Sequence, residues 1–265
     1  MAFPSDGRNH RSAINNENNT TKFLIENAKH IFNIKGSFSV EHKGGTVNKA
    51  DNVIITSDGI ISISDKEKKK GLNGSFDYTN SSAAIKDLIN SNNPSIKDIK
   101  NLIESVKKDR LLDIDKRLKL VNSYRKRVKD ACYQALTNLN EDDIMSIINT
   151  YLIKPNKDMH ILITDGKNNA RYLFPFQDHP INKIIKNGFK PSLKVKEGSS
   201  SGRIIFSKGN DNVDIGLRIR IHTNNGVNAL LGTGNSNSNS SFVLKFQQDA
   251  ITNLLKDTKA TKYEK

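Results

Sequence analysis

The spacing of apolar residues changes along the chain, and each change indicates a different kind of secondary structure. Over residues 12–32, apolar residues recur at helical spacing, with an Asn- and Thr-rich break near residues 18–21. Between residues 37 and 70 the period becomes two, and Asp58-Gly59 separates two alternating runs. That dipeptide between alternating runs is typical of a β-hairpin. We therefore expect one or two helices followed by a small antiparallel sheet.

Helical spacing returns over residues 82–151, and the last third of the chain again alternates. An apolar stripe with a basic stripe opposite it indicates a long amphipathic helix. The apolar stripe consists of Leu111, Ile114, Leu118, Val121, Val128, Cys132, Ala135 and Leu139. Alternating runs from residue 159 onwards predict strands, including one over 213–222, and residues 250–256 predict a short helix. The stretches 68–82 and 232–241 are rich in Gly, Asn and Ser and predict loops.

Together these elements predict an α+β fold: a small mixed β-sheet flanked by helices, with a helical insertion and a β-rich carboxy-terminal region. The expected segments are a flexible arm over 1–11, a core over 12–90, a helical segment over 91–152 and a β-rich nucleic-acid-binding region over 153–265. The last region either stands alone or forms one continuous domain with the core.

The net charge of the chain limits its possible functions and partners more than its length does. A formal net charge of +14, from 42 Lys and Arg against 28 Asp and Glu, attracts polyanions in a salt-dependent way. DNA or RNA is the natural partner, although an AT-rich genome also enriches Lys and Asn. Cys132 is the only cysteine, so no intramolecular disulfide forms. No apolar run approaches the roughly 20 residues that cross a bilayer, so we expect a cytoplasmic protein with no membrane role.

The stretch 38–70 places three polar residues where they can act together. Asp51 opens one predicted strand, while Ser64 and Lys66 lie two apart on the next strand and project from one face. Mg²⁺ prefers carboxylate and phosphate oxygens, lowers the pKa of bound water and neutralises charge on a scissile phosphate. A neighbouring Lys orients that water and adds electrostatic stabilisation. The three groups are therefore candidates for phosphodiester chemistry at one end of the sheet.

This stretch resembles the PD-(D/E)XK nuclease superfamily, the fold of type II restriction endonucleases. The residues that carry the resemblance are Lys49-Ala50-Asp51, the Asp58-Gly59 hairpin and Ile61-Ser-Ile-Ser64-Asp-Lys66. The resemblance implies a restriction-endonuclease-like core over about residues 12–90, with Asp51 as a Mg²⁺ ligand and Lys66 beside the attacking water. It also implies double-stranded DNA as substrate and a homodimer, because restriction enzymes pair to cut both strands.

The sequence departs from that family's pattern at two positions. Ser64 stands where the family usually has Glu or Asp, and Asp65 stands where the middle residue is usually apolar. The metal thereby loses a carboxylate, so either another acid supplies it or the site binds DNA without cutting. The acids that could supply it are Glu17 and Glu26 in the preceding helix and Glu41 on the neighbouring strand. A literal E-x-K also occurs at Glu67-Lys68-Lys69, on the opposite face.

A second group of residues is placed to contact nucleic acid. On the predicted strand around 217–222, Arg218 and Arg220 share one face and apolar residues share the other, which suits a sheet laid on DNA. Amide side chains after this strand and after the last predicted strand could read adenine edges in a major groove. The expected nucleic-acid contacts are Lys43, Lys49, Arg218, Arg220, Asn224, Asn225, Gln247 and Gln248.

The sequence as a whole favours a Mg²⁺-dependent DNA endonuclease of restriction-enzyme type that hydrolyses phosphodiester bonds. An alternative is a non-catalytic phage or viral DNA-binding protein whose sheet has lost its metal site. A third class is a structural protein whose charge only neutralises packaged nucleic acid. ATP-driven motors, zinc modules and serine hydrolases are excluded, because their phosphate loop, Cys/His spacing and nucleophile elbow are absent.

Overall fold

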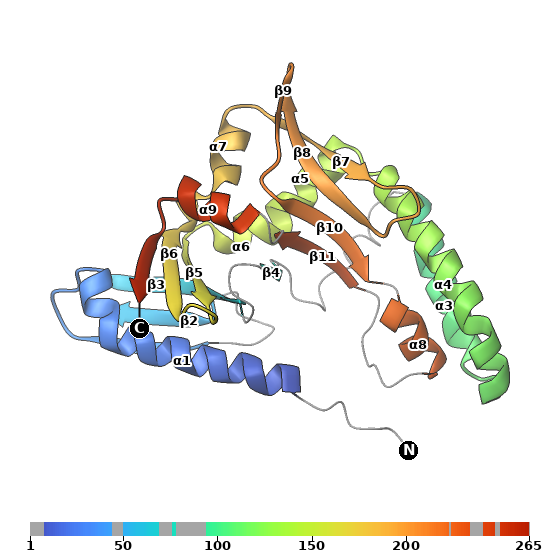
Figure 1. The fold of residues 1–265 in the computed structure, drawn as a ribbon, viewed down its shortest axis with the longest axis horizontal. Coiled ribbons are helices and arrows are strands. Elements are labelled where there is room, and N and C mark those ends of the chain that lie inside the picture. The colour runs from blue at the N-terminus through green and yellow to red at the C-terminus, as the bar shows by residue number, and fades with distance from the viewer. Residues whose placement is uncertain are drawn as a thin grey trace. The chain divides into compact units, whose positions relative to one another are not determined.

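Two compact units make up the fold, and each is assembled from segments that lie far apart in the sequence (Figure 1). The computed structural model describes residues 8–43, 50–68, 76–77, 94–222, 224–233, 241–246 and 250–264. The amino-terminal unit contains the described residues of 6–76, 153–187 and 247–265; the central unit contains those of 77–152 and 188–246. The expected segment 153–265 is therefore divided between both units. The fold is α+β, as predicted.

The amino-terminal unit is built on a mixed sheet of six strands. Its elements are α1 (Arg8–Ile31), β1 (Phe38–His42), β2 (Asn52–Thr56), β3 (Gly59–Lys68), α6 (Lys154–Asn156), β5 (Met159–Asp165), β6 (Ala170–Pro175), η3 (Phe176–Asp178), α7 (Pro180–Lys186), α9 (Ile251–Asp257) and β12 (Thr261–Glu264). The strand order is β1-β2-β3-β5-β6-β12. Only the β3–β5 pair within this order is parallel. The predicted hairpin is confirmed between β2 and β3, with Ser57-Asp58 as its turn and Gly59 as the first residue of β3.

Helix α1 covers one face of β1, β2 and β3. Leu24 and Ala28 are fully buried against Ile54 and Ile63 of the sheet, which forms the core of this unit. The predicted break near residues 18–21 is wrong, because α1 is continuous and turns the fully buried Thr20 towards the sheet. Residues 8–11 of the expected arm are the first residues of α1.

A buried histidine fixes the start of α7. The Nδ1 atom of His179 accepts a hydrogen bond from the backbone N–H of Ile181 at 3.2 Å, which caps the helix. The ring also stacks on Phe176, with 5.2 Å between the ring centroids. Burial lowers the pKa of His179 to about 3, so the ring is neutral and its Nδ1 remains an acceptor at physiological pH.

The central unit joins a helical layer to a second sheet. Its elements are α3 (Pro94–Asp109), α4 (Ile114–Thr137), α5 (Glu141–Ile148), β7 (Lys190–Val195), β8 (Ser201–Lys208), β9 (Asp211–Val213), β10 (Leu217–His222), α8 (Asn224–Leu231) and β11 (Ser241–Phe246). The π-helix η2 (Asn149–Ile153) and strand β4 (Phe76–Asp77) lie at the unit boundaries. The sheet order is β4-β11-β10-β8-β7, with β9 paired to β8.

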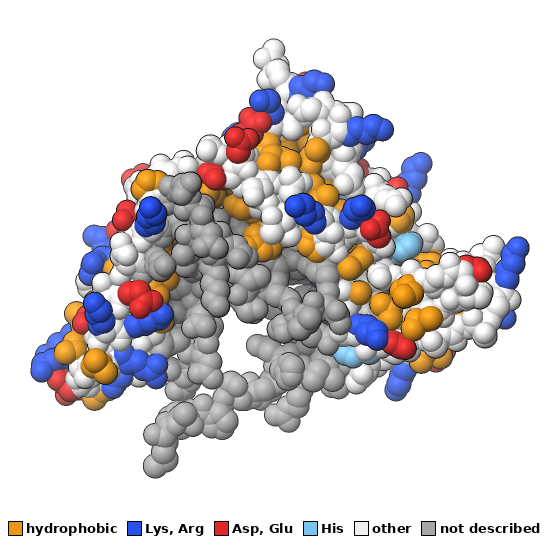
Figure 2. Space-filling model, turned by 180° about the vertical axis from the view of Figure 1, so that it is seen from behind, with side chains coloured by type: hydrophobic (Ala, Val, Ile, Leu, Met, Phe, Trp, Pro, Cys, Tyr) orange, Lys and Arg blue, Asp and Glu red, His pale blue; other side chains and the backbone are white. Residues whose placement is uncertain are grey.

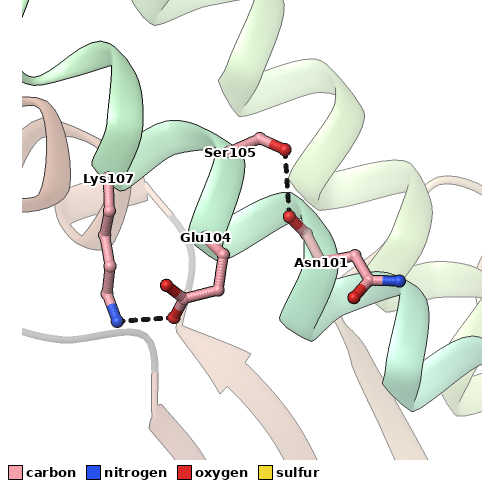
Figure 3. Close-up of polar contacts among 4 residues, drawn as sticks. All are labelled: Asn101, Glu104, Ser105 and Lys107. Carbon is pink, nitrogen blue, oxygen red and sulfur yellow. Dashed lines mark hydrogen bonds and ion pairs between the residues drawn. The ribbon is translucent and has the colours of Figure 1, made fainter.

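Helices α3 and α4 run side by side, and α4 and α5 pack on β7 (Figure 1). Along α3, polar side chains interact within the helix (Figure 3). Ser105 donates its hydroxyl to the carbonyl of Asn101 at 3.0 Å, and Lys107 pairs with Glu104 at 2.7 Å. No helix among the described residues is long and apolar enough to cross a membrane.

The predicted apolar stripe is confirmed in its second half only. Val128, Cys132 and Ala135 are buried, whereas Leu111 is 92% exposed and Leu118 is 52% exposed. Leu111 lies in the turn between α3 and α4, so its spacing relative to the later residues does not reflect a shared helix face.

Two further expectations are corrected in detail. The expected loop over 68–82 contains the short strand β4. The expected strand over 213–222 is two strands, because the chain turns at Gly216, whose φ of 81° takes it out of the extended region. Asn224 and Asn225, which follow this strand, are the first residues of α8.

Gly202 allows β7 and β8 to pack closely on the inner face of the second sheet. A Cβ atom at this position would lie 2.6 Å from Cγ of Leu193 and 2.9 Å from Cγ2 of Val195. We therefore expect Gly202→Ala to lower the free energy of unfolding by about 1–3 kcal/mol through overpacking, measured by urea denaturation. Gly36→Ala is the control, since its Cβ would meet only Ser57 at 3.5 Å. Equal losses in both variants would contradict this packing.

Candidate functional site

Asp51 is held at the point where β2 begins, between β1 and β3. Its backbone N–H donates to the carbonyl of Ile63 at 2.9 Å, and its carbonyl accepts from the backbone N–H of Lys43 at 2.9 Å. The side-chain Oδ2 accepts from the backbone N–H of Asp65 at 2.6 Å and from the hydroxyl of Ser64 at 3.3 Å. The carboxylate therefore lies against β3 and orders it, and because both side-chain bonds end on Oδ2, Oδ1 can take another partner.

Ser64 and Lys66 share the face of the sheet to which Asp51 belongs. In the parallel register, Ser64 pairs with Ile161 and Lys66 pairs with Ile163, so alternate residues of β3 project from this face. Ser64 is fully buried, and Lys66 is partly buried. The structure thus brings Asp51 and Ser64 into contact and places Lys66 two residues further along the same strand.

Asp65 projects from the opposite face, beneath α1. The hydroxyl of Thr20 donates to its Oδ2 at 2.5 Å. Burial raises the pKa of Asp65 from 3.8 to about 7; the Thr20 bond lowers it, the charge of Asp51 raises it, and the charges of Lys66 and Arg171 lower it. Asp65 stands where the PD-(D/E)XK nucleases that this stretch resembles usually have an apolar residue. Its carboxyl is partly protonated at neutral pH.

Arg171 places a positive charge on the α1 face of the sheet. It is 4% exposed, and its guanidinium carbon lies 4.4 Å from the centroid of the Phe23 ring, a cation–π contact. Burial lowers the pKa of Arg171, while the charges of Asp65 and Glu26 raise it. A second polar contact on this side joins the hydroxyl of Thr21 to Oδ1 of the buried Asn52 at 2.7 Å.

The three acids considered as further metal ligands have different positions. Glu26 is exposed on α1, and its charge acts on Arg171. Glu41 pairs with Lys43, with 2.5 Å between its Oε2 and the Lys Nζ. Glu17 lies within α1, one turn before Thr20, but its side chain is outside the described part of the chain. Among the described residues, no group of three or more His, Cys, Asp and Glu side chains could hold a metal ion.

The structure describes only some of the residues that are expected to contact nucleic acid. Arg218 and Arg220 lie on one face of β10, and Leu217 and Ile219 on the other face are fully buried, as the alternation predicts. Lys43 is exposed and bonded through its backbone to Asp51. The remaining contacts lie outside the described residues in whole or in side chain; these are Lys49, Gln247, Gln248, Asn224 and Asn225. The alternative E-x-K motif at Glu67-Lys68-Lys69 lies outside them in the same way.

Sequence reasoning misses Thr20 and Arg171 beside this site. The pattern assigns Thr20 to a helix break, because Asn and Thr are weak helix formers. Thr20 precedes Leu24 by four residues, and that spacing places it on the apolar face of one continuous helix. No comparable pattern marks Arg171, a single charged residue in an otherwise uncharged strand.

A pocket between α3 and α4 belongs to the central unit and lies apart in sequence from the Asp51 face. It has a volume of about 420 Å³ and is lined by Asp98, Asn101, Leu102, Ser105, Arg127, Asp130 and Ala131. Two of its side chains, Asn101 and Ser105, are seen in Figure 3. None of the candidate site residues lines it.

Comparison of the chain with protein-family models, with curated proteins and with solved structures finds no match.

Proposed function

We propose that the chain is a Mg²⁺-dependent DNA endonuclease whose reaction takes place on the face formed by Asp51, Ser64 and Lys66. The observation that carries the proposal is the contact of the Asp51 carboxylate with Ser64 and the Asp65 backbone, on the strand that carries Lys66. A lysine on the same strand that the Asp51 carboxylate contacts, in a chain of net charge +14, suits a phosphodiester substrate. The resemblance to PD-(D/E)XK nucleases supports the same assignment.

The donors on this face fit a hard divalent cation. Asp51 has one oxygen engaged by β3 and a second, Oδ1, that accepts no hydrogen bond from the described residues. Mg²⁺ commonly takes one or two protein carboxylates and completes its shell with waters and substrate phosphates. Asp51 would hold the ion, which when bound would lower the pKa of its water and neutralise phosphate charge.

The protein groups have separate tasks in this proposal. The Asp65 N–H and the Ser64 hydroxyl fix the orientation of the Asp51 carboxylate. Lys66 stabilises negative charge on the phosphate and orients the attacking water. By the resemblance, the protein acts as a homodimer on double-stranded DNA, with one site for each strand.

A non-catalytic DNA-binding protein is the second candidate. The observation that favours it is Ser64 in place of an acid, together with the absence of a three-acid group among the residues that the structure describes. Both candidates bind DNA, and only the first cuts it.

Incubation with supercoiled plasmid separates the two candidates. We expect the wild-type chain to convert supercoiled plasmid to nicked and linear forms in Mg²⁺, and to leave it supercoiled in EDTA. Agarose electrophoresis over a time course measures the conversion. Retarded plasmid that stays supercoiled in Mg²⁺ would favour the non-catalytic protein.

A further inference from the structure

A row of basic residues crosses the second sheet from strand to strand. Lys194 of β7 pairs with Arg203 of β8, Arg203 pairs with Arg218 of β10, and Arg218 pairs with Lys245 of β11. Residues paired in register share a face of a sheet. Four positions in line across four neighbouring strands are therefore all occupied by Lys or Arg. We call Lys194, Arg203, Arg218 and Lys245 the basic row.

The described side chains of the basic row face away from the core of the central unit. On the opposite face of the same strands, Ile204, Phe206 and Ile219 are fully buried. Lys194 is exposed, and the side chain of Arg203 is 39% exposed. Arg220, two residues beyond Arg218 on β10, is exposed and shares the outer face.

The fold does not need this concentration of charge. Like charges directly opposite one another on adjacent strands destabilise a sheet. One carboxylate, Asp214, pairs with Arg203 at 2.9 Å, and it neutralises one of these cations. On the face drawn in Figure 2, blue and red side chains are interspersed. The alignment of cations in the register therefore places like charges opposite one another, and Asp214 offsets only one of them.

We propose that the basic row binds the sugar-phosphate backbone of nucleic acid, independently of base sequence. Neighbouring strands lie about 4.8 Å apart, so four positions span roughly 14 Å. One strand of duplex DNA presents a phosphate about every 3.4 Å along the axis, so several phosphates fit this length. Arg donates in a fork that matches phosphate oxygens. The outer face shows no exposed large apolar side chain among those described, which a membrane-binding surface would carry.

The class of ligand rests on the proposed function, but the surface is separate from the Asp51 face. The basic row lies in the central unit, and Asp51 and Lys66 lie in the amino-terminal unit. Binding through the row therefore does not require Mg²⁺ or an intact Asp51. Because of this separation, binding and cleavage can be tested one at a time.

Fluorescence anisotropy of a short labelled DNA duplex in EDTA measures binding without cleavage. The row variant combines Lys194→Ala and Arg218→Ala of the basic row with Arg220→Ala on the same face, and it keeps Arg203 because Asp214 pairs with it. We expect Kd to rise at least about tenfold, and the slope of log K against log salt to fall by about one for each phosphate that is no longer neutralised. The control combines Lys119→Ala, Lys126→Ala and Lys129→Ala on α4, which removes the same charge, and should change Kd far less.

Three results would overturn the basic row as a nucleic-acid surface. Unchanged Kd in the row variant would do so, as would an equal rise in Kd in the α4 control. Tighter binding to phosphatidylserine vesicles than to DNA would assign the surface to a membrane instead. Circular dichroism melts of all three proteins check that each is folded. If the wild-type chain leaves plasmid uncut in Mg²⁺ while the row variant binds DNA more weakly than wild type, the nuclease proposal is contradicted and this inference stands.

Discussion

Asp51→Asn is expected to reduce phosphodiester hydrolysis by on the order of 10²–10³-fold or more, the size of effect seen when a charge-stabilising group is removed from an active site. The substitution removes the negative charge and keeps an oxygen that can accept from Asp65 N–H and Ser64. The strand junction should therefore survive, while the ligand for the cation is weakened. Single-turnover cleavage of plasmid in Mg²⁺ measures the rate, and a thermal melt checks the fold.

Asp58→Asn is the matched control for that loss of charge. Asp58 is exposed in the β2–β3 turn, where it accepts a hydrogen bond from the Ser57 hydroxyl at 3.2 Å. An Asn retains that acceptor, so cleavage should continue at the wild-type rate. If both variants lost activity equally, the effect would come from charge in general and not from the Asp51 face.

His179 is expected to cause the largest pH-dependent loss of stability at acid pH. Its pKa is lowered from 6.5 to about 3 in the folded chain, whereas in the unfolded chain it returns to its ordinary value. The unfolded state therefore binds a proton first as pH falls. Stability that is present above pH 6.5 is lost at about 1.4 kcal/mol per pH unit between 6.5 and 3, several kcal/mol in the limit.

The difference in urea stability between wild type and His179→Asn isolates this contribution. Asn is a good helix cap and does not titrate. At neutral pH the variant should be less stable, because it loses packing on Phe176. Its free energy of unfolding should then decrease less steeply than that of wild type as the pH falls. The gap between the two proteins should narrow or reverse as pH drops. His30→Asn, at an exposed position of α1, should follow the wild-type curve. Parallel curves for wild type and His179→Asn would refute the role of this ring.

The parts of the fold that sequence can predict are those with local patterns. The alternation of β1, β2 and β3 and the hairpin marked by Asp58-Gly59 depend on neighbouring residues, and both are confirmed. The same alternation is sufficient to place Ser64 and Lys66 on one face. The contact between Asp51 and Ser64 follows from their strands, because a hairpin fixes which residues lie opposite one another.

Long-range pairings cannot be predicted in the same way. The parallel pair of β3 and β5 joins segments that are separated in the sequence by α3, α4 and α5, and no local pattern predicts this pairing. The split of residues 153–265 between two units has the same cause. The raised pKa of Asp65 arises only when α1 packs over this residue and buries it, an effect that the Thr20 hydrogen bond opposes, so the sequence alone gives no reason to single out this acid.

The basic row shows the same limit at the surface. Arg218 and Arg220 are predicted to share a face, because they lie two apart on one strand. Lys194 and Arg203 join them only through the register of β7, β8 and β10, which the sequence does not specify. Charge along a chain can be counted from sequence, but its alignment across strands requires the fold.

Single-turnover cleavage of one labelled duplex by three proteins tests the proposed nuclease most directly. Wild type, Asp51→Asn and the row variant are compared at protein concentrations that saturate binding, in Mg²⁺. We predict that wild type cuts, that Asp51→Asn binds equally well without cutting, and that the row variant needs more protein but cuts once bound. Cutting by Asp51→Asn at the wild-type rate, or a saturated wild-type complex that leaves the duplex intact, would contradict the proposed function.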